Sequence, residues 1–417
     1  MEKLTFTIDG YSFSTAFNTA AKREQCAEKI LSTTGRHYSW YKENTGNKNL
    51  ILYDTEQYEV RNFDDIKYLV LNNKLMDVKT FLCVRRDFKG KLHLPINAST
   101  CSFMFVDINV SEIDLTEFDT TNIVDMDYMF LEADLGDCFS LGSPTNAQAN
   151  TPDRNILTLN TEGVTSMSGM FKDCKVKHLD LNSLRTHNVT DFSDMFCSCN
   201  DLIDLNVDGF DTSNAEDFHG MFQGCIKLTQ LNVKHFNVDN VLHMSCLFSK
   251  CLRLKVIDLE SWNFSQVSDA NEMFAYCEKL EKIIANFNFK MIKEMAFMFC
   301  YCTKLSKVDL SHSDLSHVFD FGYTFFKCEG LKDIRFSQGV WLKAKLTLSM
   351  FDDCKALERL NLPDVILDDV IRSYAMFDDC DNLKEIYMEH PLNLDKYEHE
   401  LIFGNCKAEV KKSTEWQ

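Results

Sequence analysis

The chain has 417 residues, 45% of them hydrophobic, so it is long enough to bury a substantial core. It carries 63 acidic and 44 basic residues, and its formal net charge of −19 argues against general binding to nucleic acid phosphates or to anionic membranes. The first 95 residues contain 15 basic and 12 acidic residues (+3), so residues 96–417 carry 29 and 51 (−22). This asymmetry predicts a domain boundary near residue 95 and a basic protein partner for the acidic part.

Residues 1–95 show no internal repeat and are predicted to form a small α+β cap or accessory domain. The spacing of apolar residues over 14–31 predicts a helix, and the alternation over 49–60 predicts a strand. Residues 1–20 lack the pattern of a secretory signal, and the sequence has no apolar stretch of about 18 residues. The sequence therefore favours a cytoplasmic protein, or an extracellular or cell-surface one whose signal has been removed.

The remainder of the chain repeats with a fixed period. Twelve phenylalanines mark the repeat, and the last ten are each followed three residues later by a cysteine. The phenylalanines are Phe105, Phe130, Phe171, Phe196, Phe222, Phe248, Phe274, Phe299, Phe325, Phe351, Phe377 and Phe403. A period in this range is the signature of a stacked array. We therefore predict a solenoid of about twelve turns of 25–26 residues over 96–406, followed by a C-terminal tail at 407–417.

Each repeat contains two kinds of segment. Its core pattern is C-x-x-L-x-x-L-x-L, and the alternation of the L-x-L part is typical of a strand with one buried face. The M-x-x-M-F part has a spacing of three to four residues, which predicts a short helical turn on the opposite side. The predicted fold is therefore an α/β solenoid with a parallel strand ladder.

One interruption breaks the period. Phe130 and Phe171 are 41 residues apart, and the excess falls at about 131–155, a polar stretch that contains two of the five prolines. Insertions in repeat proteins map to loops, often on the binding face. The alternative is a loop without a role.

Two segments carry a family resemblance. Residues 118–130 read F-D-T-T-N-I-V-D-M-D-Y-M-F, and 210–214 read F-D-T-S-N before M-F-Q-G-C at 221–225. They resemble the F-D-T-S-N-V-x-D-M-x-x-M-F-x-x-C repeat of the BspA-like leucine-rich repeats, over about three quarters of the chain. The resemblance implies a parallel-stranded solenoid without enzyme activity in the repeats. It also implies kinship with bacterial surface proteins that bind host or matrix proteins.

The polar residue inside each L-x-L is expected to point away from the core and to form a ladder across the strands. We call this ladder, together with Ile284, the strand-face ladder. Its polar members are Asp114, Asp180, Asn206, Asn232, Asp258, Asp309, Arg335, Asn361 and Tyr387. Solenoid faces often bind ligands, so this face is a candidate for recognising a basic or amide-rich partner. The alternative is a solvated face that discourages edge pairing.

A second acidic group follows the repeat phenylalanine in two neighbouring units. Asp352 and Asp353 occupy the same positions as Asp378 and Asp379, and we call these four residues the aspartate cluster. At about 5 Å, each like-charge pair repels by roughly 0.8 kcal/mol in water. A basic partner or a cation would relieve that repulsion. The alternative is that the acids spread apart and contribute only solubility.

The cysteines are interpreted as reduced and buried. Their total of 17 is odd, and an even ladder specifies no unique disulfide pairing. We expect small apolar side chains that donate weak S–H hydrogen bonds to turn carbonyls, in a reducing compartment. No metal site is predicted, because the two cysteines of each C-x-C pair, Cys197–Cys199 and Cys300–Cys302, point to alternate faces.

No catalytic or cofactor motif occurs, so no enzyme activity and no cofactor are predicted. The favoured function is a non-catalytic scaffold, an adaptor or inhibitor, that is expected to bind a basic protein without direct nucleic acid or membrane contact. One alternative is a bacterial surface adhesin. Another is a protein subunit of a nucleic-acid-processing or defence complex.

Overall fold

The computed structural model describes the chain with side chains at 100–102, 104–105, 120–139, 159–337, 346–362, 373–388 and 398–416. It describes the backbone alone at 2–8, 11–17, 38–42, 49–54, 68–71, 74–77, 90–91, 113–114, 140–141, 154–157, 340–341, 364–365 and 396–397. The chain divides into two compact units, Met1–Asn188 and Val189–Gln417. The boundary predicted near residue 95 lies inside the first unit and stays a prediction.

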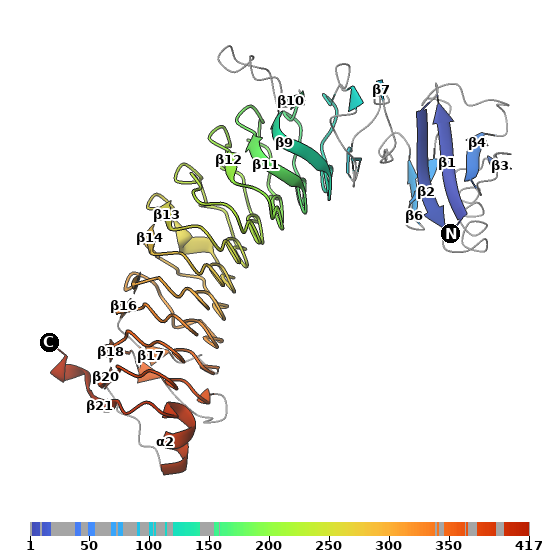
Figure 1. The fold of residues 1–417 in the computed structure, drawn as a ribbon. Coiled ribbons are helices and arrows are strands. Elements are labelled where there is room, and N and C mark those ends of the chain that lie inside the picture. The colour runs from blue at the N-terminus through green and yellow to red at the C-terminus, as the bar shows by residue number, and fades with distance from the viewer. Residues whose placement is uncertain are drawn as a thin grey trace. The chain divides into compact units, whose positions relative to one another are not determined.

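The first unit begins with a four-stranded sheet in the order β2-β1-β4-β3 (Figure 1). Its strands are β1 (Glu2–Ile8), β2 (Tyr11–Phe17), β3 (Tyr38–Lys42) and β4 (Asn49–Asp54). β1 runs antiparallel to β2 and parallel to β4, and β3 runs antiparallel to β4. Shorter pairs follow: β5 (Tyr68–Leu71) with β6 (Lys74–Asp77), and β7 (Gly90–Lys91) with β8 (Ile113–Asp114).

The helix predicted over 14–31 is wrong at its start, because residues 14–17 belong to strand β2. The sequence of β2 alternates aromatic and small side chains, and the whole strand pairs with β1. The rest of the predicted helix lies outside the described residues. The strand predicted over 49–60 is confirmed as β4 over its first six residues.

The insertion is narrower than predicted. Residues 134–141 of the expected loop form strand β9 (Asp134–Leu141), which pairs in parallel with both β10 (Arg154–Leu157) and β11 (Lys175–Asp180). β9 joins the repeat ladder because its neighbour β11 offers unpaired backbone groups one turn further along the chain. Residues 142–153 lie outside the described residues.

The second unit is a stack of parallel strands (Figure 1). Paired strands are in register exactly one repeat apart, as in Val256↔Lys282 and Lys307↔Asp333. Its strands are β12 (Asp204–Asn206), β13 (Val256–Leu259), β14 (Lys282–Ala285), β15 (Lys307–Leu310), β16 (Asp333–Phe336), β17 (Val340–Trp341), β18 (Arg359–Asn361), β19 (Asp364–Val365), β20 (Glu385–Met388) and β21 (Glu409–Lys412). The described residues of this unit also include the 3-10 helices η3 (Phe264–Gln266) and η5 (Ser413–Glu415) and the α-helix α2 (Lys396–Phe403).

The parallel-strand solenoid predicted from the repeats is confirmed, with about eight turns where about twelve were expected. Strand pairing is the irregular feature. Residues 229–234 form no strand, although the flanking rings of Phe222 and Phe248 stack as elsewhere. The spacing of the phenylalanines therefore marks every repeat, whereas strands form in only some of these repeats.

The M-x-x-M-F segments are successive β-turns and not the short helical turns that were predicted. Before Phe196, the Met195 N–H donates to the Phe192 carbonyl over 3.2 Å, and Asp194 between them has a φ of 55°. This left-handed residue prevents a helix. It also turns its own N–H sideways, where it donates to the His219 carbonyl of the next turn over 2.7 Å. Backbone bonds of this kind join neighbouring turns throughout the segment.

The repeat phenylalanines form the centre of the core. They are buried, and the ring centroids of consecutive repeats lie 5.1–5.7 Å apart in stacked geometry. The stack runs from Phe105 to Phe171 in the first unit and from Phe196 to Phe403 in the second. Each aromatic pair contributes about 0.5–1.5 kcal/mol beyond the area that it buries.

The cysteine ladder makes the S–H bonds that the sequence predicted. The Cys277 thiol donates to the carbonyl of Phe248, the repeat phenylalanine of the preceding turn, over 3.1 Å. Seven further cysteines make the equivalent bond over 2.8–3.3 Å: Cys174, Cys225, Cys251, Cys302, Cys328, Cys354 and Cys380. Burial raises the pKa of Cys277 well above its ordinary value, so the thiol keeps its proton and remains a donor.

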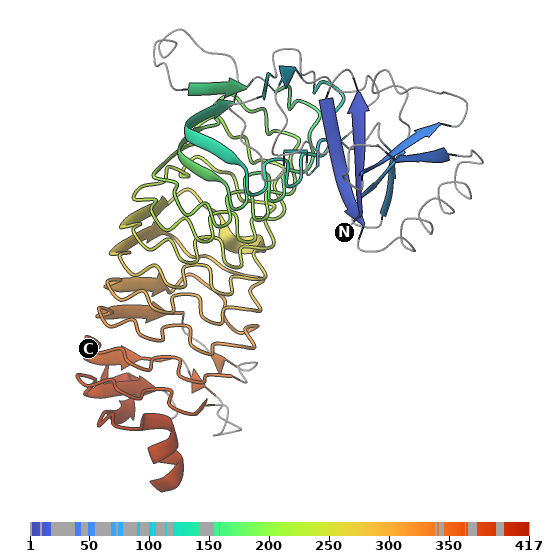
Figure 2. The same cartoon turned by 45° about the vertical axis from the view of Figure 1, so that its right-hand side comes forward.

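The C-terminal segment 407–417 was predicted to be a tail, but its residues 409–412 are part of the solenoid. Strand β21 pairs in parallel with β20 and adds the last rung of the ladder. Helix α2 takes the place of the β-turn segment in this final repeat, and Figure 2 shows it beside the last strands. The carbonyls of Leu401 and Ile402 accept the N–H groups of Ala375 and Phe377. The helix therefore caps the backbone groups that the last turn would otherwise expose.

We predict that Cys277→Ala lowers the free energy of unfolding by about 1–2 kcal/mol, because the Phe248 carbonyl loses its buried donor and a small cavity forms. Cys277→Ser is expected to lose less, since its hydroxyl donates to the same carbonyl. Urea denaturation measures both. Cys246→Ala is the control, because Cys246 is only partly buried and lies off the ladder. An equal loss in the control and in Cys277→Ala would contradict a role for the S–H bond.

Candidate functional site

The strand-face ladder forms in the predicted register. Asp258 pairs with Ile284, Asp309 with Arg335, and Asn361 with Tyr387, each from neighbouring strands. Among its members with described side chains, the exposed ones are Asn232 and Arg335, and the partly exposed polar ones are Asp180, Asn206, Asp258, Asp309 and Asn361. Asp114 has only its backbone described. Within the second unit, the paired strands therefore place these side chains in a column, with one exception at its C-terminal end.

That exception is Tyr387, which is 3% exposed and cannot contact a partner as the sequence predicted. Its ring packs against Trp416 with centroids 5.0 Å apart, and its hydroxyl donates to Glu385 over 2.8 Å. The Arg359 guanidinium donates to the same hydroxyl over 2.9 Å and lies 4.8 Å from the Trp416 ring. Tyr387 therefore anchors the C-terminal segment, because that segment folds back over its strand.

Several ladder residues have a structural task at the end of their strands. The Asp258 carboxylate accepts the N–H of Glu260 over 3.1 Å, and the Asp309 carboxylate accepts that of Ser311 over 3.0 Å. The same bond joins two further pairs, Asp180–Asn182 and Asn206–Asp208. Asp and Asn favour turns through this local bond. The preference for these residues at the ladder position therefore has a cause that needs no partner.

Charges on the strand face are paired between turns. Lys234 lies 3.1 Å from Asp258 and 2.7 Å from Glu260, and Arg335 lies 4.0 Å from Asp309. The Glu260 N–H and the Lys234 ammonium hold the pKa of Asp258 below its usual range. Such exposed pairs each contribute about 0.2–1 kcal/mol. The strand face is thus less acidic than its aspartates alone suggested.

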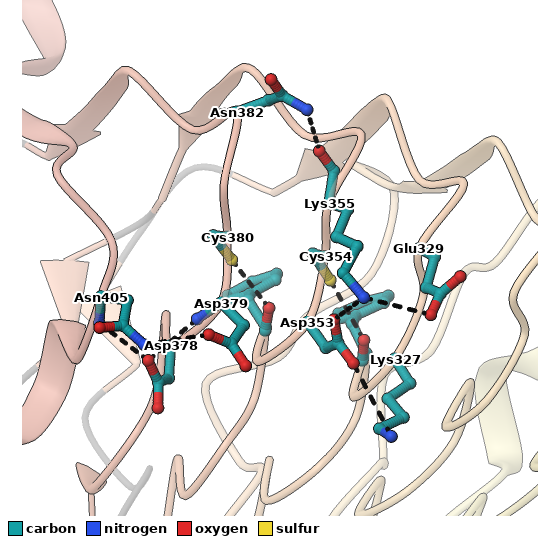
Figure 3. Close-up of polar contacts among 12 residues, drawn as sticks. Lys327, Glu329, Asp353, Cys354, Lys355, Asp378, Asp379, Cys380, Asn382 and Asn405 are labelled. Atoms are coloured by element: carbon teal, nitrogen blue, oxygen red, sulfur yellow. Dashed lines mark hydrogen bonds and ion pairs between the residues drawn. The ribbon is translucent and has the colours of Figure 1, made fainter.

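The aspartate cluster lies on the opposite side of the repeat, in the β-turn segments. Figure 3 shows Asp353 between two lysines: its carboxylate lies 2.6 Å from Lys355 and 3.8 Å from Lys327. Lys355 also donates to Glu329 of the preceding turn over 3.4 Å. The side chain of Asp353 is only 12% exposed. Its charge is therefore balanced within the protein and is not presented to a partner.

Asp378 is engaged as well. Its carboxylate accepts the backbone N–H of Asn405 over 2.8 Å and that of Asp379 over 3.0 Å (Figure 3). Asp379 accepts one bond from the Asn405 side chain over 3.2 Å and remains solvent-accessible. The four predicted site residues are thus close together but unequal: Asp353 and Asp378 support the fold, whereas Asp352 is partly exposed and Asp379 is exposed.

Asp352 shows the electrostatic cost of the cluster. Burial is the main cause that raises the pKa of Asp352 from 3.8 to about 6. The carboxylates of Asp378, Asp353 and Asp379 contribute to this rise, whereas a hydrogen bond from Ser349 opposes it. The repulsion that the sequence predicted between like charges is therefore present, although desolvation is the larger cause. Near neutral pH this carboxylate is ionised at a cost to stability, and a basic partner would lower that cost.

A further acidic column was missed in the sequence. It lies five residues before the repeat phenylalanine, where successive turns form parallel β-bridges. Its members in the second unit are Asp191, Asp217, His243, Asp269, Glu294 and Asp320. Burial is the main cause that raises the pKa of Asp217 and of Glu294, and acidic neighbours one turn away add to it. The sequence pattern that reveals this column is an acidic residue at a fixed distance before the repeat phenylalanine.

Neither a metal site nor a membrane span emerges from the described residues. They contain no group of three or more His, Cys, Asp or Glu side chains arranged to hold a metal ion. Among the helices described, none has the length and apolar character needed to cross a membrane.

We predict that Asp352→Asn changes how stability depends on pH. Because the folded pKa exceeds the unfolded one, the contribution of Asp352 is complete below about pH 4 and is lost as the pH rises through about 6. The full shift is discounted to about 1 kcal/mol for solvent screening. The variant should therefore be more stable than the wild type at pH 7.5, with no difference attributable to this group at pH 4.

Urea midpoints at pH 4, 5, 6 and 7.5 measure this effect. Asp381→Asn, in an exposed position of the same repeat, is the matched control. A wild type and an Asp352→Asn variant with parallel pH profiles would contradict the assignment.

Two family models match overlapping parts of the chain. "Mycoplasma protein of unknown function, DUF285" matches residues 97–137, 145–229, 165–287 and 199–310. "BspA type Leucine rich repeat region (6 copies)" matches residues 298–412. A comparison with curated proteins gives no match.

Three solved structures are similar to this chain. A leucine-rich repeat protein from Bacteroides ovatus ATCC 8483 matches 90% of this chain and 98% of its own, with 15% identity and a TM-score of 0.41. A leucine rich cell surface protein from Faecalibacterium prausnitzii A2-165 matches 66% and 88%, with 14% identity and a TM-score of 0.27. A leucine-rich repeat protein from Eubacterium ventriosum ATCC 27560 matches 67% and 77%, with 13% identity and a TM-score of 0.28. Together with the repeat pattern and the parallel-strand solenoid, the family matches establish that the chain belongs to the BspA-like leucine-rich repeat family.

Proposed function

We propose that this protein is a non-catalytic scaffold that binds a basic protein through the β-turn side of its solenoid, at the aspartate cluster. The observation that carries the proposal is the environment of Asp352, whose pKa is raised to about 6 beside three further carboxylates. An ionised group that is costly in the free protein becomes favourable when a lysine or arginine approaches.

The rest of the chain supports a basic partner. Residues 96–417 have a balance of −22, which attracts basic proteins over a distance and gives association rates that fall as salt rises. The strand face is the weaker candidate, because its lysines and arginines already pair with its acids, as Lys234 does with Asp258. The turn side therefore carries the proposed contact.

The two alternatives from the sequence differ in partner and in compartment. The cytoplasmic location finds no support in the comparisons, whereas one similar structure is that of a cell surface protein. A surface-exposed scaffold is therefore the second candidate. Protease treatment of intact source cells distinguishes the two, since only a surface protein is degraded. Membership of a nucleic-acid-processing complex stays a prediction, and nuclease treatment tests it.

The test is quantitative capture by the full chain from source-cell extract and from the cell-surface fraction, with and without nuclease, at low and high salt. Wild type is compared with Asp352→Asn/Asp379→Asn, which keeps the shape of both side chains. Reversal of all four charges is avoided, because Asp353 and Asp378 hold the fold. We expect a basic protein that binds at low salt, dissociates at high salt and binds the variant about tenfold more weakly.

The matched control is Asp258→Asn/Asp309→Asn, which removes two carboxylates from the strand face. This control should retain capture, since those acids are paired within the protein. Equal capture by wild type and by Asp352→Asn/Asp379→Asn at low salt would refute the proposed site. Capture that disappears with nuclease would favour the nucleic-acid complex instead.

A further inference from the structure

The β-turn side of the repeat holds two columns of left-handed residues. They lie two residues before and two residues after the repeat phenylalanine, and we call the surface that they form the turn face. Glycine occupies some of these positions, such as Gly220 and Gly224 with φ of 58° and 74°. Glycine suits them because it has no Cβ to clash in this conformation. Any other residue there is held against its backbone preference.

Aromatic residues occupy the turn face in the central repeats of the second unit. Four of them have left-handed backbones: Tyr276, Phe297, Tyr301 and Tyr323, with φ of 61°, 58°, 59° and 57°. Phe326 lies among them, and we call these five residues the aromatic cluster. Bulky side chains with positive φ are rare and costly, and such strain in natural proteins gathers at functional sites. The chain retains these rings at positions where glycine would fit with less strain.

The five rings form one connected surface. Tyr276 stacks on Tyr301 with centroids 4.9 Å apart, and Phe297 stacks on Tyr323 at 4.7 Å. Phe326 joins the two stacks, since it meets both Tyr301 and Tyr323 edge-on at 5.5 Å. All five side chains are partly exposed. Unlike the buried phenylalanine stack of the core, this cluster therefore contacts solvent.

Lys327 connects the aromatic cluster to the aspartate cluster. Its ammonium lies 5.3 Å from the centre of the Tyr301 ring, 5.6 Å from that of Phe326 and 3.8 Å from the Asp353 carboxylate. The rings therefore already accept one cation from the protein itself. The Lys327 N–H also donates to the Asp352 carbonyl over 2.9 Å, so the last turn of the aromatic cluster is hydrogen-bonded to the first turn of the aspartate cluster.

We propose that the aromatic cluster and the aspartate cluster form a single docking surface for an extended, arginine-containing segment of the basic partner. This inference rests on the proposed function and names the part of the partner that binds. A guanidinium group stacks on aromatic rings and pairs with carboxylates, so one arginine-rich apolar segment satisfies both clusters. A lysine ammonium suits the carboxylates but matches the rings less well.

The length of the segment follows from the spacing of the turns. The surface extends over four intervals, from the repeat of Phe274 to that of Phe377. At about 4.8 Å for each turn, this span is about 19 Å, and an extended chain covers it with about six residues. The proposed segment is therefore a linear peptide of about this length and not a folded domain.

The test selects random linear octapeptides on the immobilised full chain and then measures the affinity of the enriched peptides by fluorescence polarisation. Two double variants are compared with wild type: Tyr301→Gly/Tyr323→Gly, and Asp352→Asn/Asp379→Asn. We expect peptides that contain arginine beside aliphatic or aromatic residues, and at least about tenfold weaker binding to each variant. Replacement of the arginines by lysine should weaken binding to wild type as well.

Glycine is chosen because it accepts the left-handed backbone, so the tyrosine variant should keep its melting temperature within about 3 °C. Tyr128→Gly is the matched control. Tyr128 is also a partly exposed tyrosine with positive φ, at 53°, and lies outside the cluster. It should bind the peptides as wild type does.

The outcomes separate this inference from the proposed function. Peptides that lose affinity for the aspartate variant but not for the tyrosine variant would overturn the docking surface and leave the acidic scaffold in place. Enriched peptides without arginine, or peptides that bind both variants as tightly as wild type, would also overturn it. If the docking surface is overturned, the capture experiment still tests the proposed function independently.

Discussion

Each turn of this protein depends on its neighbour for backbone hydrogen bonds, and the left-handed residues of the β-turn segments create that dependence. A left-handed residue such as Asp194 ends any helical run and turns its N–H toward the carbonyl of the next turn. A single repeat would leave these groups unpaired, at a cost of about 1–3 kcal/mol for each buried group. The cysteine side chains of the ladder depend on the neighbouring turn in the same way, since each thiol donates to a carbonyl one turn away. Stacking is therefore obligatory, and capping by α2 follows from it.

Strict stacking also decides what the surface displays. Equivalent residues of successive turns become neighbours, so a lysine and an acid one repeat apart form an ion pair, as Lys307 and Asp333 do at 3.1 Å. Many acids have local tasks as well, because Asp and Asn at strand ends accept the backbone N–H two residues on. The net charge of residues 96–417 is thus a poor guide to which carboxylates meet a partner. The informative carboxylate is Asp352, whose environment raises its pKa.

Two features of the second unit differ from the residue preferences of the repeat, and they lie in successive turns. Tyrosine and phenylalanine occupy left-handed positions, and carboxylates gather at Asp352. Sequences normally agree with their fold at every level, and natural proteins break that agreement mainly at functional sites. Lys327 contacts the rings of Tyr301 and Phe326 and the carboxylate of Asp353, and it therefore joins the aromatic cluster and the aspartate cluster on one surface. Their adjacency is the structural basis for treating them as one site.

The sequence by itself determined the period, the buried phenylalanines and the thiol donors, because a repeat of fixed length places equivalent residues in contact whatever the local backbone does. It also indicated the strand register and the crowding of the four aspartates. It failed where the outcome depends on contacts distant in sequence. The M-x-x-M-F spacing fits a helical turn, and only pairing with the next turn makes left-handed β-turns the better solution. Tyr387 follows the ladder pattern, yet the returning C-terminal segment buries it beneath Trp416. The aromatic cluster escaped notice because its members occupy different positions within the repeat, and stacking in three dimensions is what brings their rings together.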